Sequence, residues 1–175
     1  MMNYNVDIYE TDDKNLYRFA LGISSNKNLF VFGLNPSTAD NKDPDQTIKK
    51  IMGFAEKNGY DSFVMLNLYP QRATNPNELD KFPNENIIRE NERIILNLVS
   101  KQKNPNILLA WGDNIFVRDY LIDCLIKIYQ LMPSQVNWWR IGDLTKKGQP
   151  RHPSRIAYQD FQKMDMDAYL RNVVD

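Results

Sequence analysis

The sequence predicts an α/β fold: a three-layer α/β/α sandwich around a central, mainly parallel four-stranded sheet, with an added N-terminal pair of antiparallel strands. Two observations support this prediction. Short apolar runs alternate along the chain with segments whose apolar residues recur at helical spacing, a pattern typical of strand–helix–strand units. In addition, 175 residues with a hydrophobic fraction of 42 % are enough to fill one core. We therefore expect residues 1–175 to form a single domain.

The first two elements are expected to be the antiparallel strands. Asn5–Glu10 and Leu16–Ile23 flank the polar segment Asp12–Asn15, whose residues are typical of tight turns. Four later segments are predicted as the strands of the parallel sheet, because each is short, apolar and followed by glycine or a polar residue. These are Leu29–Gly33, Ser62–Asn67, Ile107–Trp111 and a segment through Trp138–Ile141.

Apolar residues at helical spacing predict helices between and after these strands. Asp45 is a candidate cap for the first helix and Asn58-Gly59 its expected end, while Asn84 is expected to open the second. The third helix is predicted from about Asn114 to Leu131, and the last over Met164–Val174. Because parallel strands need crossover connections, these helices are expected to cover both faces of the sheet.

Composition excludes several classes of protein. Lys+Arg and Asp+Glu each number 22, and a net charge of zero argues against a protein that coats nucleic acid by neutralising phosphates. No apolar run approaches the roughly 18 residues of a membrane span, and the polar N-terminus is unlike a secretory signal. The single Cys124 and single histidine disfavour disulfides and most metal sites. We therefore expect a cytoplasmic protein with no membrane partner, no metal and no cofactor.

Polar loops follow each of the four predicted parallel strands. In open sheets of this type, ligands bind outside the carboxyl ends of the strands, where such loops meet. The loops are Leu34–Asp40, Leu68–Asn75, Gly112–Asn114 and Asp143–Arg155. The sequence therefore predicts one site, built from four loops, at this edge of the sheet.

Two of these loops carry compact motifs. The first is Gly33-Leu34-Asn35-Pro36-Ser37, and the second is Arg151-His152-Pro153-Ser154, which holds the only histidine of the chain. An Asn-Pro pair is most often an ordinary turn. Alternatively, the Asn35 amide can orient a water molecule or a ligand at the sheet edge.

The loop after the second parallel strand offers further candidates. Asn67 ends that strand, and its amide can pair with a pyrimidine edge, while Arg72 can meet a phosphate. The alternative is that Asn67 caps its own loop and Arg72 is solvated. Residues 146–155 contain four Lys or Arg and no acid, a run that is by itself most simply a solvated loop.

Together these motifs resemble the active-site motifs of the uracil-DNA glycosylase superfamily. The similar segments, in the family's order, are Gly33–Pro36, Val64–Asn67 with Arg72–Thr74, Ala110–Gly112 and His152–Ser154. Several short motifs in one order are far more specific than any one of them. The chain as a whole also resembles a set of bacterial and phage proteins of unknown function, the DUF1643-type family, which carry Asn-Pro-Ser-Thr-Ala and Arg-His-Pro.

The glycosylase resemblance implies a uracil-DNA glycosylase-like domain and a metal-free hydrolysis of an N-glycosidic bond in DNA repair. Asn35 would position the attacking water, and His152 would stabilise the negative charge on the departing base. Asn67 would hydrogen-bond the base edge. Asn35 stands where the fastest branch has an aspartate, so this amide orients water without being able to take its proton.

The resemblance also implies contacts to the rest of a nucleotide. The residues expected to bind phosphate or DNA are Ser37, Arg72, Lys147, Arg151, Ser154 and Arg155. No aromatic residue lies between Asn35 and Gln46, where the family has its base-stacking ring, so Tyr69 or Phe82 would have to supply it. Arg155 or Ile156 would wedge into the space that a flipped nucleotide leaves.

Three functions stay open at this point. The first is a DNA N-glycosylase acting on uracil or another altered base. The second is a non-catalytic module that binds a nucleobase, a nucleotide or modified DNA, and the third is an enzyme acting on free nucleotides or hypermodified bases. The order of the motifs and His152 favour the first, whereas zero net charge and Asn35 favour the other two.

Overall fold

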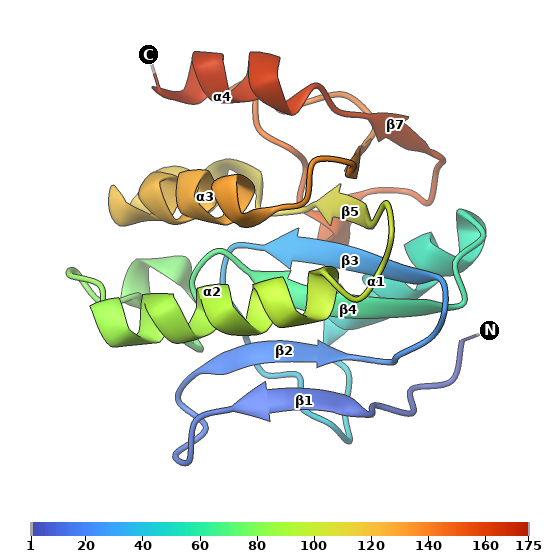
Figure 1. Cartoon of the computed structure of the whole chain (residues 1–175), viewed down its shortest axis with the longest axis horizontal. Coiled ribbons are helices and arrows are strands. Elements are labelled where there is room, and N and C mark those ends of the chain that lie inside the picture. Colours follow the sequence, from blue (N-terminus) through green and yellow to red (C-terminus); the bar gives the residue numbers. More distant parts are fainter. Residues whose placement is uncertain (1, 175) are drawn as a thin grey trace.

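A mixed seven-stranded sheet organises the computed structural model of the chain, which describes residues 2–174 (Figure 1). The strands are β1 (Ile8–Thr11), β2 (Arg18–Gly22), β3 (Asn28–Gly33), β4 (Ser62–Asn67), β5 (Asn106–Leu109), β6 (Asn137–Ile141) and β7 (Phe161–Lys163). The α-helices are α1 (Gln46–Lys57), α2 (Glu85–Val99), α3 (Tyr120–Leu131) and α4 (Met166–Val174). Short 3₁₀ helices are η1 (Pro76–Glu78), η2 (Gly112–Val117) and η3 (Pro153–Arg155).

The α/β class is confirmed, but the sheet is mixed and has seven strands, whereas a mainly parallel sheet of four strands was expected. The strand order is β1-β2-β4-β3-β5-β6-β7. Three neighbouring pairs, β3–β4, β3–β5 and β5–β6, are parallel, and the three outer pairs are antiparallel. The predicted N-terminal antiparallel pair is confirmed as β1 and β2, and it forms part of the main sheet because β2 also bonds to β4. The opposite edge carries β7, a strand of three residues that pairs with β6 and was not predicted.

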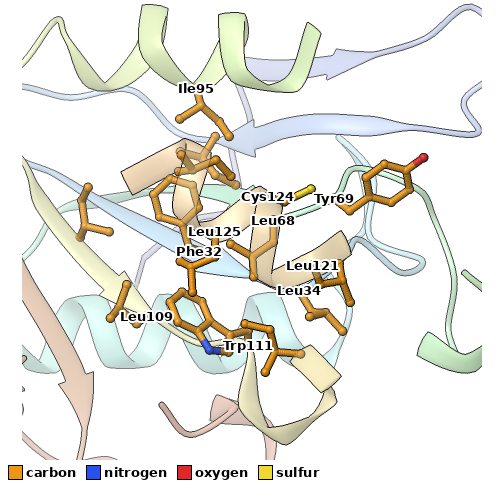
Figure 2. Packing of buried hydrophobic residues seen from close by; sticks show 14 of the residues in the cluster. Phe32, Leu34, Leu68, Tyr69, Ile95, Leu109, Trp111, Leu121, Cys124 and Leu125 are labelled. Carbon is orange, nitrogen blue, oxygen red and sulfur yellow. The ribbon is translucent and has the colours of Figure 1, made fainter. Parts of the chain in front are cut away.

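Both faces of the sheet are covered. One hydrophobic cluster packs α2, α3 and α4 on one face, and a second packs α1 on the other. Cys124 belongs to the first cluster, together with Phe32 and Trp111 (Figure 2). Burial raises the pKa of the Cys124 thiol to about 12, as expected for a small core residue rather than a nucleophile. None of the helices in the described residues has both the length and the apolar character of a membrane span.

Local signals set the ends of two helices as predicted. The Asp45 carboxylate accepts the N–H of Ile48 at 2.9 Å and so caps α1. The chain leaves this helix through Asn58 and then Gly59, whose φ of +76° suits a residue without a side chain. Asn84 caps α2 by accepting the N–H of Asn86 at 3.0 Å.

The predicted helix from Asn114 to Leu131 is wrong in its first part. There the chain forms η2, and Arg118 is extended, with φ −142° and ψ +135°. The Arg118 guanidinium donates to the backbone carbonyls of Asn77, Leu79 and Asp80. These bonds to a distant loop compete with helix geometry, and α3 begins only at Tyr120.

The capping bond at α2 leads to a stability prediction. We expect Asn84→Ala to lower the free energy of unfolding by about 1 kcal/mol, because the N–H of Asn86 loses its acceptor. In a domain of this size that corresponds to a fall in Tm of roughly 2–4 °C. Thermal unfolding followed by circular dichroism measures both. Asn97→Ala, at an exposed interior position of the same helix, is the matched control, and an equal loss in the two variants would contradict the capping role.

Candidate functional site

A cavity of about 730 Å³ lies beyond the carboxyl ends of β3, β4 and β5. Its size is that of cavities that hold small ligands. Each of the four loops predicted to meet at this edge contributes to its wall, as do the first residues of α1 and Arg18 of β2. A second hollow of about 770 Å³ lies along α1 and is lined by none of the predicted site residues, so residue content, not volume, identifies the candidate site.

Asn35 lies in the cavity wall with its amide held in one orientation. Its Nδ2 donates to the carbonyls of Ala73 at 2.8 Å and Pro36 at 3.0 Å. Within the described residues, the Asn35 Oδ1 accepts no hydrogen bond. Because the amide nitrogen already donates within the protein, the Oδ1 of Asn35 is a hydrogen-bond acceptor in the cavity wall that a ligand or water molecule can use.

His152 lines the same cavity and caps the start of η3. Its Nδ1 is 2.9 Å from the Ser154 hydroxyl and accepts the backbone N–H of Ser154 at 3.3 Å. An accepting Nδ1 places the proton of the neutral ring on Nε2. The side chain is exposed by surface area, yet the cavity wall replaces part of its hydration. This desolvation lowers the pKa of His152, and the Asp45 carboxylate acts in the opposite sense.

Gly112 permits the approach of the His152 segment to the end of β5. Its φ is +66°, and its N–H donates to the carbonyl of Pro150 at 2.9 Å. A Cβ at this position would lie 3.3 Å from the Cβ of His152. The Trp-Gly pair that the sequence singled out therefore has a geometric role: the glycine leaves room for His152.

Asn67 lies directly behind the cavity wall. It is fully buried, and neither its Oδ1 nor its Nδ2 has a hydrogen-bond partner. Gly33 and Met65 form the wall in front of it. A Cβ built on Gly33 would lie 3.0 Å from the Asn67 Oδ1 and 2.5 Å from the Met65 Cε. The amide is thus close to the cavity without lining it, and the Met65 side chain lies beside it.

The other predicted residues divide into two groups. Ser37, Ser154 and Arg155 line the cavity. Tyr69, Arg72, Lys147 and Arg151 do not line it. Tyr69 is fully buried in the cluster under α2 and α3, where its hydroxyl accepts the N–H of Asn84 at 3.0 Å. It is therefore placed to pack the core, not to stack on a base in the cavity.

The three cations outside the cavity have local partners or another location. Arg72 donates to the carbonyl of Ser37 at 2.6 Å and to the Asn15 side chain at 3.0 Å. Arg151 donates to the carbonyl of Asp143 at 2.6 Å, and Lys147 lines a different hollow beside α4. Arg72 thus braces the loop that holds Asn35. Phe82, the other aromatic candidate, is 75 % exposed and lies outside the cavity wall.

Two charged residues in the wall were not predicted as site residues. Asp45 accepts the N–H of Ala39 at 3.3 Å as well as that of Ile48, so the helix cap is also a carboxylate of the cavity. Arg18 is 2 % exposed and donates from Nη1 to the carbonyl of Ala39 at 2.8 Å. The available signal was a charge at the head of the apolar run Arg18–Gly22, since buried charges require partners.

Residues 2–174 contain no group of three or more His, Cys, Asp or Glu side chains placed to hold a metal ion. Three polar groups of the cavity wall bear on the chemistry it can carry out. These are an amide acceptor at Asn35, an Nε2–H donor at His152 and a carboxylate at Asp45. A donor and an acceptor facing one cavity suit a reaction in which charge develops on a leaving group while a water molecule attacks.

The single histidine allows a direct test of this electrostatic arrangement. We expect the ring protons of His152 to titrate below pH 6.5 in the folded protein and near 6.5 in urea. Asp45→Asn should lower the pKa further, because it removes the opposing carboxylate charge but keeps an N-capping side chain. NMR titration measures all three values, and an unchanged or raised pKa in the folded protein would contradict the arrangement.

The same shift predicts a dependence of stability on pH. Because the folded-state pKa is lowered, the unfolded chain binds more protons in the interval between the folded value and 6.5. The contribution of His152 is therefore complete above pH 6.5 and is lost as the pH falls through this interval. Urea unfolding at several pH values, with His152→Gln as the control, measures it.

One comparison with known proteins gives a match. The family model described as "Protein of unknown function (DUF1643)" matches residues 18–154. No curated protein and no solved structure matches the chain, and nothing in these comparisons supports a relationship to the uracil-DNA glycosylase superfamily. The matched residues run from Arg18 to Ser154 and include every wall residue of the cavity except Arg155. The chain therefore belongs to the DUF1643 family.

Proposed function

We propose that this cavity binds a nucleobase and that the chain hydrolyses the N-glycosidic bond between that base and its sugar. The observation that carries the proposal is the pairing of Asn35 with His152. These residues are 117 positions apart in the sequence, line one cavity, and present an unused acceptor and a ring N–H donor. The relation to the uracil-DNA glycosylase superfamily, including its three-layer arrangement, belongs to this proposal and rests on the order of the motifs.

In the proposed reaction the bond from the sugar carbon to the base nitrogen breaks, and its electron pair leaves with the base. The Nε2–H of His152 donates to the oxygen on which the negative charge develops. A neutral imidazole is sufficient for this task, and desolvation of His152 favours the neutral form. The oxygen of a water molecule that donates to the Asn35 Oδ1 forms the new bond to the sugar carbon.

Asp45 supplies what Asn35 lacks. An amide orients water but cannot take its proton, whereas the Asp45 carboxylate lines the same cavity. Each carboxylate oxygen already accepts one backbone N–H bond and keeps a second lone pair. We assign Asp45 as the group that accepts the proton of the attacking water.

Asn67 is the proposed reader of the base edge. Its amide carries a donor and an acceptor side by side, which suits the paired groups of a pyrimidine edge. The buried amide does not line the cavity, but Met65 beside it does, and an unbranched methionine side chain moves more readily than a branched one. On rotation of Met65, a base in the cavity would satisfy an amide that has no partner within the protein.

Action on a base within DNA is the second candidate, and one observation favours it. Ser154 and the exposed Arg155 lie at the cavity beside His152, where they can meet a phosphate of a flipped nucleotide. Lys147 lies elsewhere, and Arg151 donates to carbonyls of its own loop. A small nucleotide therefore fits the distribution of cations better than a long stretch of DNA, which requires many phosphate contacts.

The hydrolysis proposal is tested by measuring released base. The protein is incubated with pyrimidine nucleotides, nucleosides and uracil-containing oligonucleotides, and free base and abasic sites are quantified by chromatography and alkaline cleavage. We expect His152→Ala and Asn35→Ala each to lower the rate about 100-fold or more, because the first removes the donor to the developing charge and the second removes the acceptor that orients the water. Asp45→Asn should lower it without loss of the α1 cap.

Asn97→Ala, on the exposed face of α2, is the matched control for Asn35→Ala and should leave the rate unchanged. Thermal unfolding establishes that each variant is folded. If no substrate releases base while nucleotides still bind in a manner that depends on Asn35 and His152, the chain is a non-catalytic binding module and the hydrolysis proposal is wrong.

A further inference from the structure

Arg18 is an unusual residue for the interior of a sheet. It is the first residue of β2, and with 2 % exposure it is as buried as the apolar residues that follow it. Arg93, by contrast, is exposed and paired with Glu90. Removing a guanidinium from water is costly unless its donors and its charge find partners. The question is therefore what partners Arg18 has.

The protein satisfies only part of this guanidinium. Nη1 donates to the carbonyl of Ala39 at 2.8 Å, whereas Nε is buried with no partner and Nη2 makes no hydrogen bond to the described residues. The carbonyl of Ala39 is also shared, because Arg72 donates to it at 3.1 Å. Two cations thus converge on one neutral acceptor, which leaves Arg18 short of acceptors.

No carboxylate of the described residues completes the pairing. No ion pair within 4.0 Å joins Arg18 to Asp or Glu among residues 2–174. Asp45 is near enough for its charge to act on Arg18, but it forms no ion pair with the guanidinium. Desolvation, and then the charge of Arg72, lowers the pKa of Arg18 to about 10. The residue therefore stays charged at neutral pH.

The cavity surrounds Arg18 with further donors. Ser37, Thr38 and Thr47 line it with hydroxyl groups. Thr47 and Gln46 are the first residues of α1, a helix of 12 residues whose N-terminus faces the cavity. Hydroxyls, a helix N-terminus and a guanidinium are the groups that proteins use to bind phosphate.

We propose that Arg18 anchors a terminal phosphate of a nucleotide in this cavity. The inference rests on the proposed function, since it takes the same cavity to hold the base, and it narrows the substrate class to phosphate monoesters. A phosphodiester is linked to a further nucleotide on each side, so it is poorly suited to a guanidinium as enclosed as that of Arg18. A terminal phosphate is linked on one side only and can fit such an enclosed site. The substrate is thus a mononucleotide and not a base inside a DNA strand.

The strand order supports a ligand with two separate ends. Arg18 lies on β2, whereas His152 packs against Gly112, just after β5. The order β2-β4-β3-β5 places three strand spacings, about 14 Å in all, between those strands. A nucleotide carries its phosphate and its base at opposite ends of the sugar.

The first experiment uses the wild-type chain. Calorimetry compares uridine 5′-monophosphate, uridine, inorganic phosphate, acetate and a uracil-containing oligonucleotide without terminal phosphates. We expect the monophosphate to bind about 10- to 100-fold more tightly than the nucleoside, the range for charge-assisted hydrogen bonds. Phosphate should compete with it, and acetate should not. Acetate that competes as well as phosphate, or nucleoside that binds as well as nucleotide, would overturn the phosphate assignment.

The second experiment changes the arginine. Arg18→Met keeps the length of the side chain and removes the charge, Arg18→Lys keeps the charge and removes the planar fork, and Arg93→Met removes an equally positive charge far from the cavity. We expect Arg18→Met to abolish the preference for nucleotide over nucleoside, Arg18→Lys to retain part of it, and Arg93→Met to leave it unchanged. If Arg18→Met does not fold, Arg18→Lys and the wild-type ligand series decide.

The outcomes separate this inference from the hydrolysis proposal. If phosphate binding depends on Arg18 but no substrate releases its base, the phosphate site is supported and the hydrolysis proposal is wrong. If nucleosides and oligonucleotides release their base, and Arg18→Lys and Arg18→Met leave the rates unchanged, the hydrolysis proposal is supported and the phosphate site is wrong. A wild-type chain that binds neither inorganic phosphate nor uridine 5′-monophosphate overturns the inference outright.

Discussion

The connection from β3 to α1, residues 34–45, has no regular structure, so its backbone polar groups must find partners outside a helix or a sheet. Side chains supply them. Arg72 donates to the carbonyls of Ser37 and Ala39, Arg18 donates to that of Ala39, and Asp45 accepts the N–H of Ala39. The same segment provides Asn35 and Asp45 to the cavity wall. The candidate site thus depends on a loop that charged side chains hold in place.

This arrangement gives the charged residues two tasks at once. Asp45 caps the start of α1 and is a carboxylate of the cavity, and Arg18 donates to a backbone carbonyl while its Nε stays without a partner. A loop held only by surface contacts would leave the orientation of Asn35 to chance, because each ordered group costs conformational entropy. Here the bond from Asn35 to Ala73 and the bond from the Ala73 N–H to Pro36 tie two loops into one wall.

Features that depend only on neighbouring residues were predicted from the sequence, namely the helix caps at Asp45 and Asn84 and the end of α1 at Gly59. Features that depend on contacts with residues far along the chain were not. The guanidinium of Arg118 binds carbonyls about 40 residues away and keeps its own segment out of α3, and β7 exists only through its pairing with β6. Likewise, motifs identified Asn35 and His152, but Arg18 and Asp45 belong to the cavity through packing that no spacing in the sequence encodes.

Buried polar groups without partners are few in native proteins, and those that occur call for a reason. In the described residues the buried unpartnered side-chain atoms are Arg18 Nε, both polar atoms of the Asn67 amide, Asn91 Oδ1 and Glu92 Oε1. Arg18 lines the cavity and Asn67 lies behind its wall, while Asn91 donates to the backbone carbonyl of Asn67. The buried polar atoms without a hydrogen-bond partner thus lie mainly around the end of β4. A core under selection for stability alone would replace Arg18 and Asn67 with apolar residues of similar size. Their presence beside the cavity that Asn35 and His152 line is what a binding site requires, because a ligand satisfies polar groups that the fold leaves open.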